Sequence, residues 1–292
     1  MSEDSPLSKR SKALLWFLVC TMVRQYFTEK TTWLQTSISN QLKTKNMTIK
    51  EYFSRTGFVT LPDMVVEDEL ETLRGIYSDF LHGKYDLDGF RSDLTGDISS
   101  DKKVEKITQI MRPSLIDSRL PETTTYRKAL DTARELLGDD IEMDFDMMIN
   151  KAPGTHAETP WHQDAAYWPD LPDKRAVSFW MALDDADTQN GCMMYIAGSH
   201  ILPIQPHFQP VSGGALQCRI DEKAEISYGK LKAGSAIAHH GYTLHAALGN
   251  SSADRNRRAL ILNFRPKAMI DLMRSRGYDH LGNRETKTKP GK

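Results

Sequence analysis

The chain has 292 residues, of which 39% are apolar and 26% charged, so it can bury a sizeable core as one domain. Its formal net charge of -1 gives no sign of a nucleic-acid partner. The three cysteines show neither metal-ligand spacing nor a disulfide framework, which indicates a reducing compartment, and we expect a cytoplasmic protein.

Residues 1–46 are predicted to form an N-terminal extension, helical or flexible, ahead of a domain over residues 47–292. The one apolar run of the extension, residues 13–23, is shorter than the ~20 residues that a membrane helix needs. No small-x-small cleavage site follows it. A helix packed on the domain or a frayed extension is therefore favoured over membrane association. The final residues do not match the Ser-Lys-Leu type of peroxisomal signal, so we expect no such address there.

Two helices are predicted in the first half of the domain. Over residues 66–81 apolar side chains recur at helical spacing, acidic residues occupy the first turn, and Gly83 is a stop signal. A second helix is predicted over residues 126–137 and ends at Gly138. Residues 86–101, between the two, are polar and rich in Gly, Asp and Ser, and we expect a loop that folds over a site.

Strands are predicted in the second half. Residues 141–149 alternate apolar and acidic side chains, which is typical of a half-buried strand. Further strands are predicted over residues 177–183, 192–196, 235–239 and 259–264. Short strands separated by Gly, Asn and Pro turns indicate a mainly β fold of the sandwich or jelly-roll type.

The triplet His162-Gln163-Asp164 is the first candidate for chemistry. Alternate side chains of a strand share a face, so His162 and Asp164 can face one ion while Gln163 points away. A neutral imidazole suits iron, and a carboxylate favours the divalent ion. With one more histidine they would form the facial triad of a non-haem iron(II) oxygenase, which leaves half the coordination sphere open. Alone the triplet is weak evidence, because such triplets occur often by chance.

Several downstream histidines compete for the third position. His239 and His240 lie on a predicted strand, and either could reach a metal if register were the only guide; His245 follows them. His200 and His207 are predicted to be loop residues, and we expect neither to be a ligand.

Five segments, in order, resemble the phytanoyl-CoA dioxygenase family. They are Trp161 to Tyr167, Asn190-Gly191-Cys192, Gly198-Ser199-His200, His240-Gly241 with His245, and Asn250 with Arg257-Arg258-Ala259. They cover most of residues 47–266. The resemblance implies a double-stranded β-helix, that is, a cupin-like jelly roll, with α-helices packed outside.

The resemblance also implies a set of ligands. Iron(II) would be bound by His162, Asp164 and His245. His245 is selected over the other downstream histidines because, in the family, a His-Gly pair precedes a short apolar run and then the ligand. Arg257 is implied to bind the distal carboxylate of 2-oxoglutarate. Arg258 stays an alternative, since the chain carries one extra residue before this pair and strand parity allows only one of the two to face the site.

Arginine suits this position because its planar guanidinium donates two parallel hydrogen bonds to a carboxylate and stays charged. Lys151 and Trp180 stand where family members line the cosubstrate or substrate pocket. The alternatives are a solvated charge at a strand end for Lys151 and an ordinary core aromatic for Trp180.

The function implied is an oxidoreductase, an iron(II)- and 2-oxoglutarate-dependent dioxygenase that uses O2 and releases succinate and CO2. Halogenating relatives lack the carboxylate that Asp164 supplies, so hydroxylation or another oxidation is favoured over halogenation. Aromatic and proline residues at 167–169 and 202–210 favour an apolar pocket, and hence a lipid-like substrate or a secondary metabolite. No dense basic cluster marks a site for the phosphates of an acyl-CoA.

Two other classes of function stay open. One is a catalytically silent relative that serves as a binding module, against which the intact ligands argue. The other is a cupin-like metal-dependent isomerase or hydrolase, which would need no arginine for a cosubstrate carboxylate. The sequence does not indicate an oligomeric state.

Overall fold

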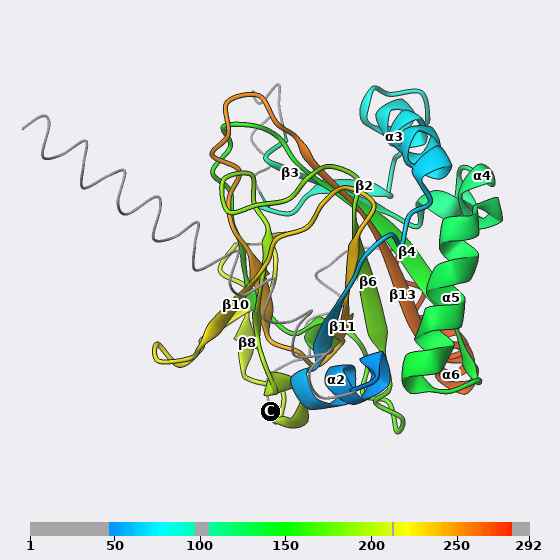
Figure 1. The fold of residues 1–292 in the computed structure, drawn as a ribbon, viewed down its shortest axis with the longest axis vertical. Helices are drawn as coiled ribbons and strands as arrows, with labels where there is room; N and C mark the ends of the chain where they lie inside the picture. The colour runs from blue at the N-terminus through cyan, green and yellow to red at the C-terminus, as the bar shows by residue number, and fades with distance from the viewer. Residues whose placement is uncertain (1–46, 97–104, 212, 282–292) are drawn as a thin grey trace, which may run out of the picture. The chain divides into compact units, whose positions relative to one another are not determined.

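The computed structural model describes residues 47–96, 105–211 and 213–281 (Figure 1). The predicted extension, with its apolar run at residues 13–23, lies outside the described residues, so its boundary with the domain stays a prediction. Among the described residues, every helix is too short or too polar to cross a membrane.

Antiparallel strands build most of the domain. Their bounds are β1 Phe58–Leu61, β2 Arg91–Asp93, β3 Ile107–Met111, β4 Ile141–Lys151, β5 Thr159–His162, β6 Val177–Ala182, β7 Met193–Ile196, β8 His207–Phe208, β9 Gln217–Cys218, β10 Ile226–Gly229, β11 Ala236–His240, β12 His245–Ala247 and β13 Arg257–Pro266. One sheet has the order β1-β11-β6-β13-β4-β3-β2, a second has the order β10-β7-β12-β5, and β8 pairs with β9. Apart from β2, β3 and β4, which are consecutive in the chain, the neighbouring strands of the two large sheets are not consecutive in the sequence, as in a jelly roll. Within the described residues, neither large sheet closes on itself. The predicted mainly β fold is confirmed.

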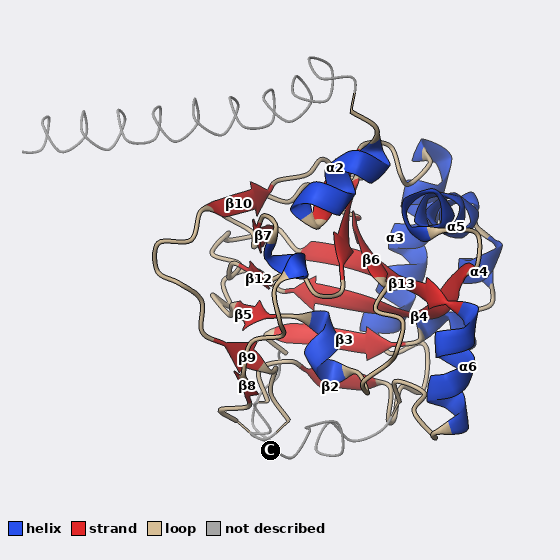
Figure 2. Ribbon diagram, turned by 90° about the horizontal axis from the view of Figure 1, so that it is seen from below, coloured by secondary structure: helices blue, strands red, loops and turns tan. Residues whose placement is uncertain are grey.

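Helices cover the outer face of the seven-stranded sheet. The α-helices are α2 Ile49–Thr56, α3 Glu67–Leu81, α4 Arg119–Glu122, α5 Thr124–Leu137 and α6 Lys267–Ser275, and the 3-10 helices are η1 Pro113–Leu115, η2 Asp164–Tyr167 and η3 Ser199–Ile201. Figures 1 and 2 show α3, α4, α5 and α6 on one side of this sheet and the four-stranded sheet on the other. The space between the two sheets is where the candidate site lies.

Both predicted helices are confirmed as α3 and α5. α5 begins two residues earlier than predicted because the Thr123 side chain accepts a hydrogen bond from the Tyr126 backbone N–H. It ends at Gly138, whose φ of 122° favours glycine. Gly83, the predicted stop after α3, also has a positive φ of 81°.

The prediction that residues 141–149 form a half-buried strand is wrong about the polar face. Asp144 and Asp146 of β4 are buried, because α5, α6 and the segment after α6 cover the side on which they lie. Asp146 accepts hydrogen bonds from Tyr126 Oη of α5 at 2.7 Å and from Ser114 Oγ at 2.8 Å. Asp144 forms an ion pair at 2.5 Å with Arg274 of α6. The alternation therefore marks a strand covered on both faces, whose polar side is filled by buried hydrogen bonds and ion pairs.

The other predicted strands correspond to β6, β7, β11 and β13. β13 is longer than predicted, since it begins at Arg257 and runs to Pro266. The predicted loop over residues 86–101 is partly wrong, because β2 lies within it and pairs with β3 at the sheet edge. Residues 97–101 of this predicted loop lie outside the described residues. Residues of that segment nevertheless line the cavity described below, as predicted for a loop over the site.

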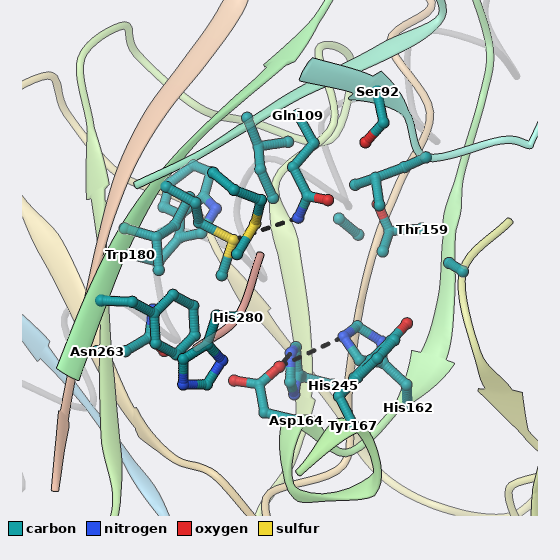
Figure 3. A pocket seen from close by; sticks show the side chains of 18 of the residues that line it. Ser92, Gln109, Thr159, His162, Asp164, Tyr167, Trp180, His245, Asn263 and His280 are labelled. Atoms are coloured by element: carbon teal, nitrogen blue, oxygen red, sulfur yellow. Dashed lines mark hydrogen bonds and ion pairs between the residues drawn. The ribbon is translucent and has the colours of Figure 1, made fainter. Parts of the chain in front are cut away.

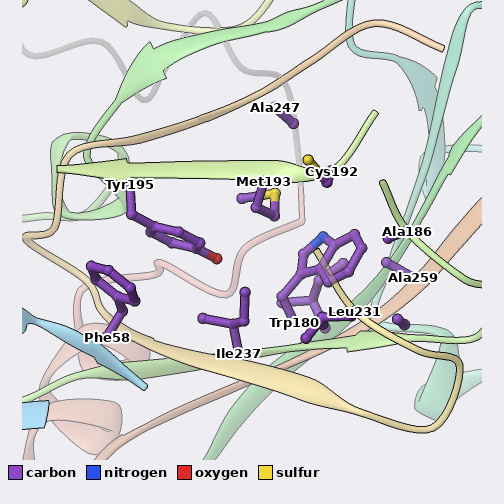
Figure 4. Close-up of a cluster of buried hydrophobic side chains, with 12 residues drawn as sticks. Phe58, Trp180, Ala186, Cys192, Met193, Tyr195, Leu231, Ile237, Ala247 and Ala259 are labelled. Carbon is purple, nitrogen blue, oxygen red and sulfur yellow. The ribbon is translucent and has the colours of Figure 1, made fainter. Parts of the chain in front are cut away.

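An apolar cluster joins the two sheets (Figure 4). Phe58 of β1 stacks on Tyr195 of β7 with ring centroids 4.7 Å apart. Trp180 of β6 and Ile237 of β11 pack into the same cluster. Buried rings between the sheets fix the separation of the strands that carry the site residues.

Candidate active site

The three residues predicted as metal ligands lie together. His162 ends β5 and His245 begins β12, and the two face each other directly across the pair of strands. Asp164 Oδ1 lies 3.6 Å from His162 Nε2 and 3.5 Å from His245 Nε2. The donor atoms of all three lie within 4.8 Å of one another, close enough to hold one ion.

The prediction that His162 and Asp164 lie on one face of a strand is correct only for the position of His162. Only His162 is in a strand, whereas Asp164 is the first residue of η2. The start of this 3-10 helix, rather than strand alternation, brings the carboxylate to the imidazole. Gln163 does point away, as predicted, and its side chain donates to the Tyr242 carbonyl and accepts from the Gln205 N–H.

Backbone carbonyls fix the tautomer of both histidines. Nδ1 of His162 lies 2.8 Å from the Pro160 carbonyl, and Nδ1 of His245 lies 2.9 Å from the Thr243 carbonyl. Since a carbonyl only accepts, each Nδ1 donates its proton there, which leaves Nε2, the nitrogen on the Asp164 side, as the one that can bind a metal. Two neutral imidazoles and one carboxylate with this orientation fit a divalent metal ion such as iron(II).

The electrostatics agree with this protonation. Burial would raise the pKa of Asp164, but His245, His162 and His239 lower it, and the net pKa is well below the ordinary value. Burial, together with the neighbouring His162, holds the pKa of His245 well below its ordinary value. The site therefore offers an ionised carboxylate and a neutral imidazole at neutral pH.

The histidines set aside as ligands have other contacts. His200 Nε2 lies 3.0 Å from the Ser54 carbonyl, and His207 Nε2 accepts a hydrogen bond from the Gln163 N–H. His240 Nδ1 accepts a hydrogen bond from the Tyr242 N–H. His239 differs, because its Nε2 lies 3.3 Å from Asp164 Oδ2, the carboxylate oxygen that faces away from the other two histidines. Sequence reasoning missed this contact, which depends on the pairing of β11 with β6.

Arg257 lines the same cavity as the triad and is 1% exposed. Its Nε and Nη1 have no hydrogen-bond partner in the described part of the chain. Burial lowers the pKa of Arg257 to about 10, so the guanidinium stays charged at neutral pH. Buried donors without partners need an explanation, and a carboxylate bound in the cavity would supply one.

Arg258 is directed differently. Its Nε and Nη2 donate to the two carboxylate oxygens of Asp184, at 2.9 and 2.7 Å. Of the two arginines left open by the sequence, the one on the cavity side is therefore Arg257.

Lys151 is neither a solvated charge at a strand end nor a residue that lines the cavity, the two interpretations that the sequence left open. It is fully buried and not solvated, and it is not among the described residues that line the cavity. Its Nζ donates to three backbone carbonyls, those of Ala157, Ala247 and Leu248. Because these contacts use the donors of the ammonium group, the geometry favours a structural role.

Trp180 is both a pocket residue and a core aromatic, the two interpretations that the sequence left open. It lines the cavity and is also part of the apolar cluster between the sheets. The Arg257 guanidinium lies 5.1 Å from the centre of its ring, which supports the cation from one side.

The cavity has a volume of about 520 Å³ (Figure 3). Much of its wall is apolar: Met111, Phe145, Met147, Ile149, Trp168 and Met193. Figure 3 shows Ser92, Gln109 and Thr159 on the side opposite Asp164 and His245. Tyr167 and Trp168 line the cavity as predicted, but none of residues 202–210 is among its described lining residues.

The model of the phytanoyl-CoA dioxygenase family matches residues 53–259. The chain belongs to this family. Peroxisomal phytanoyl-CoA dioxygenase of Bos taurus is 23% identical over 226 residues, which are 74% of this chain and 67% of the bovine protein. A probable alpha-ketoglutarate-dependent hypophosphite dioxygenase of Stutzerimonas stutzeri is 28% identical over 172 residues, 55% of this chain and 59% of that protein.

A crystal structure of EvdO2 from Micromonospora carbonacea var. aurantiaca, complexed with 2-oxoglutarate, is similar with a TM-score of 0.61 and 27% identity. The match covers 74% of this chain and 88% of EvdO2.

The chain spans about half to two thirds of the length of the curated relatives it matches. The predicted family is confirmed, and so is the predicted enzyme class, an iron- and 2-oxoglutarate-dependent dioxygenase, at the level of the family.

Proposed function

We propose that this chain is an iron(II)- and 2-oxoglutarate-dependent dioxygenase that hydroxylates an uncharged, mainly apolar small molecule. The observation that carries the proposal is the buried guanidinium of Arg257, which lines the same cavity as the triad and has two nitrogens without a partner among the described residues. A metal-dependent isomerase or hydrolase would not need this cation.

The proposal gives each residue a role. His162, Asp164 and His245 would hold the iron, and Arg257, supported by Trp180, would bind the distal carboxylate of 2-oxoglutarate. Together with bound 2-oxoglutarate, the iron supplies the activation of O2 that oxidises a carbon-hydrogen bond. The protein orients the carboxylate, keeps the His245 imidazole neutral and excludes water with its apolar wall.

The composition of the wall supports an uncharged substrate. Apart from Arg257, the one arginine lining the cavity among the described residues is Arg91, whose Nε donates to both carboxylate oxygens of Glu105 at 2.9 and 3.1 Å. An acyl-CoA needs cations for its phosphates. Among the described lining residues, Arg91 is paired with Glu105 and Arg257 is assigned to the cosubstrate, so neither arginine is available for these phosphates. A molecule with an apolar body and a few hydroxyl or carbonyl groups matches the Met, Phe and Trp wall and the polar side formed by Ser92, Gln109 and Thr159.

A screen of succinate release tests this proposal. Purified protein with iron(II), 2-oxoglutarate and O2 would be offered neutral terpenoids, polyketides and fatty alcohols beside acyl-CoA thioesters. We expect succinate release to rise with a neutral compound and a product heavier by one oxygen atom to form. Asp164→Ala is the control and should give neither. Stimulation by acyl-CoA thioesters alone would contradict the proposed substrate class, and no turnover with any class would favour the silent binding module.

A further inference from the structure

Three polar residues lie side by side across the seven-stranded sheet, next to Asp164. His239 of β11 is paired in register with Ser178 of β6, and Ser178 is paired with Asn263 of β13. The three are 3%, 1% and 2% exposed, respectively. A row of buried polar side chains on neighbouring strands needs hydrogen-bond partners. Ser178 and His239 share the Asp164 carboxylate as a partner, and Asn263 contacts Ser178.

The two oxygens of Asp164 have different surroundings. Oδ1 faces Nε2 of His162 and Nε2 of His245. Oδ2 lies 3.0 Å from Ser178 Oγ and 3.3 Å from His239 Nε2. One oxygen is thus directed at the ligand histidines and the other at the polar row.

The donors in this row can be assigned from chemistry. An ionised carboxylate only accepts, so Ser178 Oγ–H and His239 Nε2–H both donate to Oδ2. His239 Nδ1 then accepts from Tyr195 Oη–H, which lies 3.4 Å away. Each imidazole nitrogen of His239 therefore has one partner and one role.

Asn263 completes the chain of donors once its amide is turned. Its Oδ1 is placed 2.6 Å from Ser178 Oγ, and its Nδ2 has no partner in the described part of the structure. The single proton of Ser178 is already given to Asp164, so Ser178 Oγ must accept from Asn263. Rotating the amide by 180° places Nδ2 at Ser178 Oγ, and the oxygen and nitrogen of an amide are nearly indistinguishable in shape. Asn263 Nδ2 then donates to Ser178 Oγ, and Ser178 Oγ–H donates to Asp164 Oδ2.

We propose that His239, Ser178 and Asn263 form a carboxylate clamp that restricts Asp164 to one metal-binding oxygen. The clamp occupies Oδ2 with two donors and leaves Oδ1 for the ion. A carboxylate free to bind through both oxygens would take a coordination position that the cosubstrate or O2 requires. The clamp rests on the proposed function, and its residues are positioning residues that act through Asp164.

Cobalt(II) is a suitable probe, because its visible absorption reports binding without turnover. We would titrate Co²⁺ into the full chain and then titrate 2-oxoglutarate into the cobalt-loaded protein. The variants are Ser178→Ala, His239→Phe and the double variant. His239→Gln is the conservative replacement, because the glutamine Nε2 can replace the donor lost with the imidazole. Ser252→Ala is the matched control, because Ser252 is a buried, hydrogen-bonded serine that makes its contacts with Asn250 and Arg255.

We expect Ser178→Ala and His239→Phe each to weaken Co²⁺ binding about 10-fold, and the double variant to weaken it about 100-fold. The cobalt-loaded double variant should also bind 2-oxoglutarate more weakly than the parent. His239→Gln should recover most of the Co²⁺ affinity, and Ser252→Ala should match the parent. Thermal unfolding of Ser178→Ala and Ser252→Ala shows whether their losses of stability are comparable.

The outcomes separate the clamp from the proposed function. Equal Co²⁺ affinity in Ser178→Ala, His239→Phe and Ser252→Ala would overturn the clamp alone. Binding of Co²⁺ by the parent without binding of 2-oxoglutarate would overturn the proposed function, and the relative Co²⁺ affinities would still decide the clamp. A parent that binds no Co²⁺ would overturn both.

Discussion

At the scale of single residues, Arg257 and Arg258 are neighbours with opposite surroundings. Arg257 is buried with two nitrogens unpartnered among the described residues, whereas Arg258 is paired with Asp184. Arg257→Ala is expected to weaken 2-oxoglutarate binding about 100-fold, roughly 3 kcal/mol, because a buried carboxylate would lose its cation. Arg258→Ala should change this affinity by less than about threefold. Anaerobic titration with iron(II) present measures both, and equal losses in the two variants would refute the assignment.

Lys151 carries a second residue-scale prediction. Lys151→Met removes the donor to three buried carbonyls and should lower the free energy of unfolding by about 2–4 kcal/mol. Urea denaturation measures this change. An unchanged midpoint combined with a lost affinity for 2-oxoglutarate would instead support the pocket role that the family resemblance implies.

At the scale of elements, β4 is tied to the helix that covers it. Tyr126 Oη of α5 donates to the buried carboxylate of Asp146 on β4. Tyr126→Phe should therefore lower the free energy of unfolding by about 1–3 kcal/mol, since the carboxylate loses a donor that water does not replace. The control is Tyr85→Phe, which loses a hydrogen bond to Asp117 at a more exposed position. If the urea midpoints fall equally in both variants, the burial of Asp146 does not increase the contribution of its hydrogen bond to the free energy of unfolding.

The same elements show what the sequence could predict. α3 and α5 were predictable because their periodicity and glycine stops are local. The burial of Asp144 and Asp146 was not, since their partners come from α5, α6 and His280. Likewise, the triad was predictable from the family-like segments, but the contact of His239 with Asp164 depends on the pairing of β11 with β6, which no local pattern reveals.

At the scale of the whole molecule, buried histidines predict how stability depends on pH. Burial lowers the pKa of His240 and of His280 from 6.5 to about 4. Below pH 6.5 the unfolded chain takes up these protons and the folded chain does not, so stability is full above pH 6.5 and falls towards pH 4. Each histidine contributes at most roughly 3 kcal/mol over this window.

Urea unfolding at pH 7.5, 6.0 and 5.0 checks this pH dependence. The free energy of unfolding should decrease at each step, and His240→Asn should make the decrease smaller. A stability that stays constant or rises between pH 7.5 and pH 5.0 would contradict the burial of both imidazoles.

One cavity is proposed to hold both the metal and the cosubstrate. The most direct test of this proposal is anaerobic addition of iron(II) and 2-oxoglutarate to the parent and to Asp164→Ala and Arg257→Ala, followed by visible absorption. We expect a metal-to-ligand charge-transfer band in the parent. The band should be lost in Asp164→Ala, and in Arg257→Ala it should require far more 2-oxoglutarate. Absence of the band in a parent that binds iron(II) would show that 2-oxoglutarate does not bind the metal in this cavity.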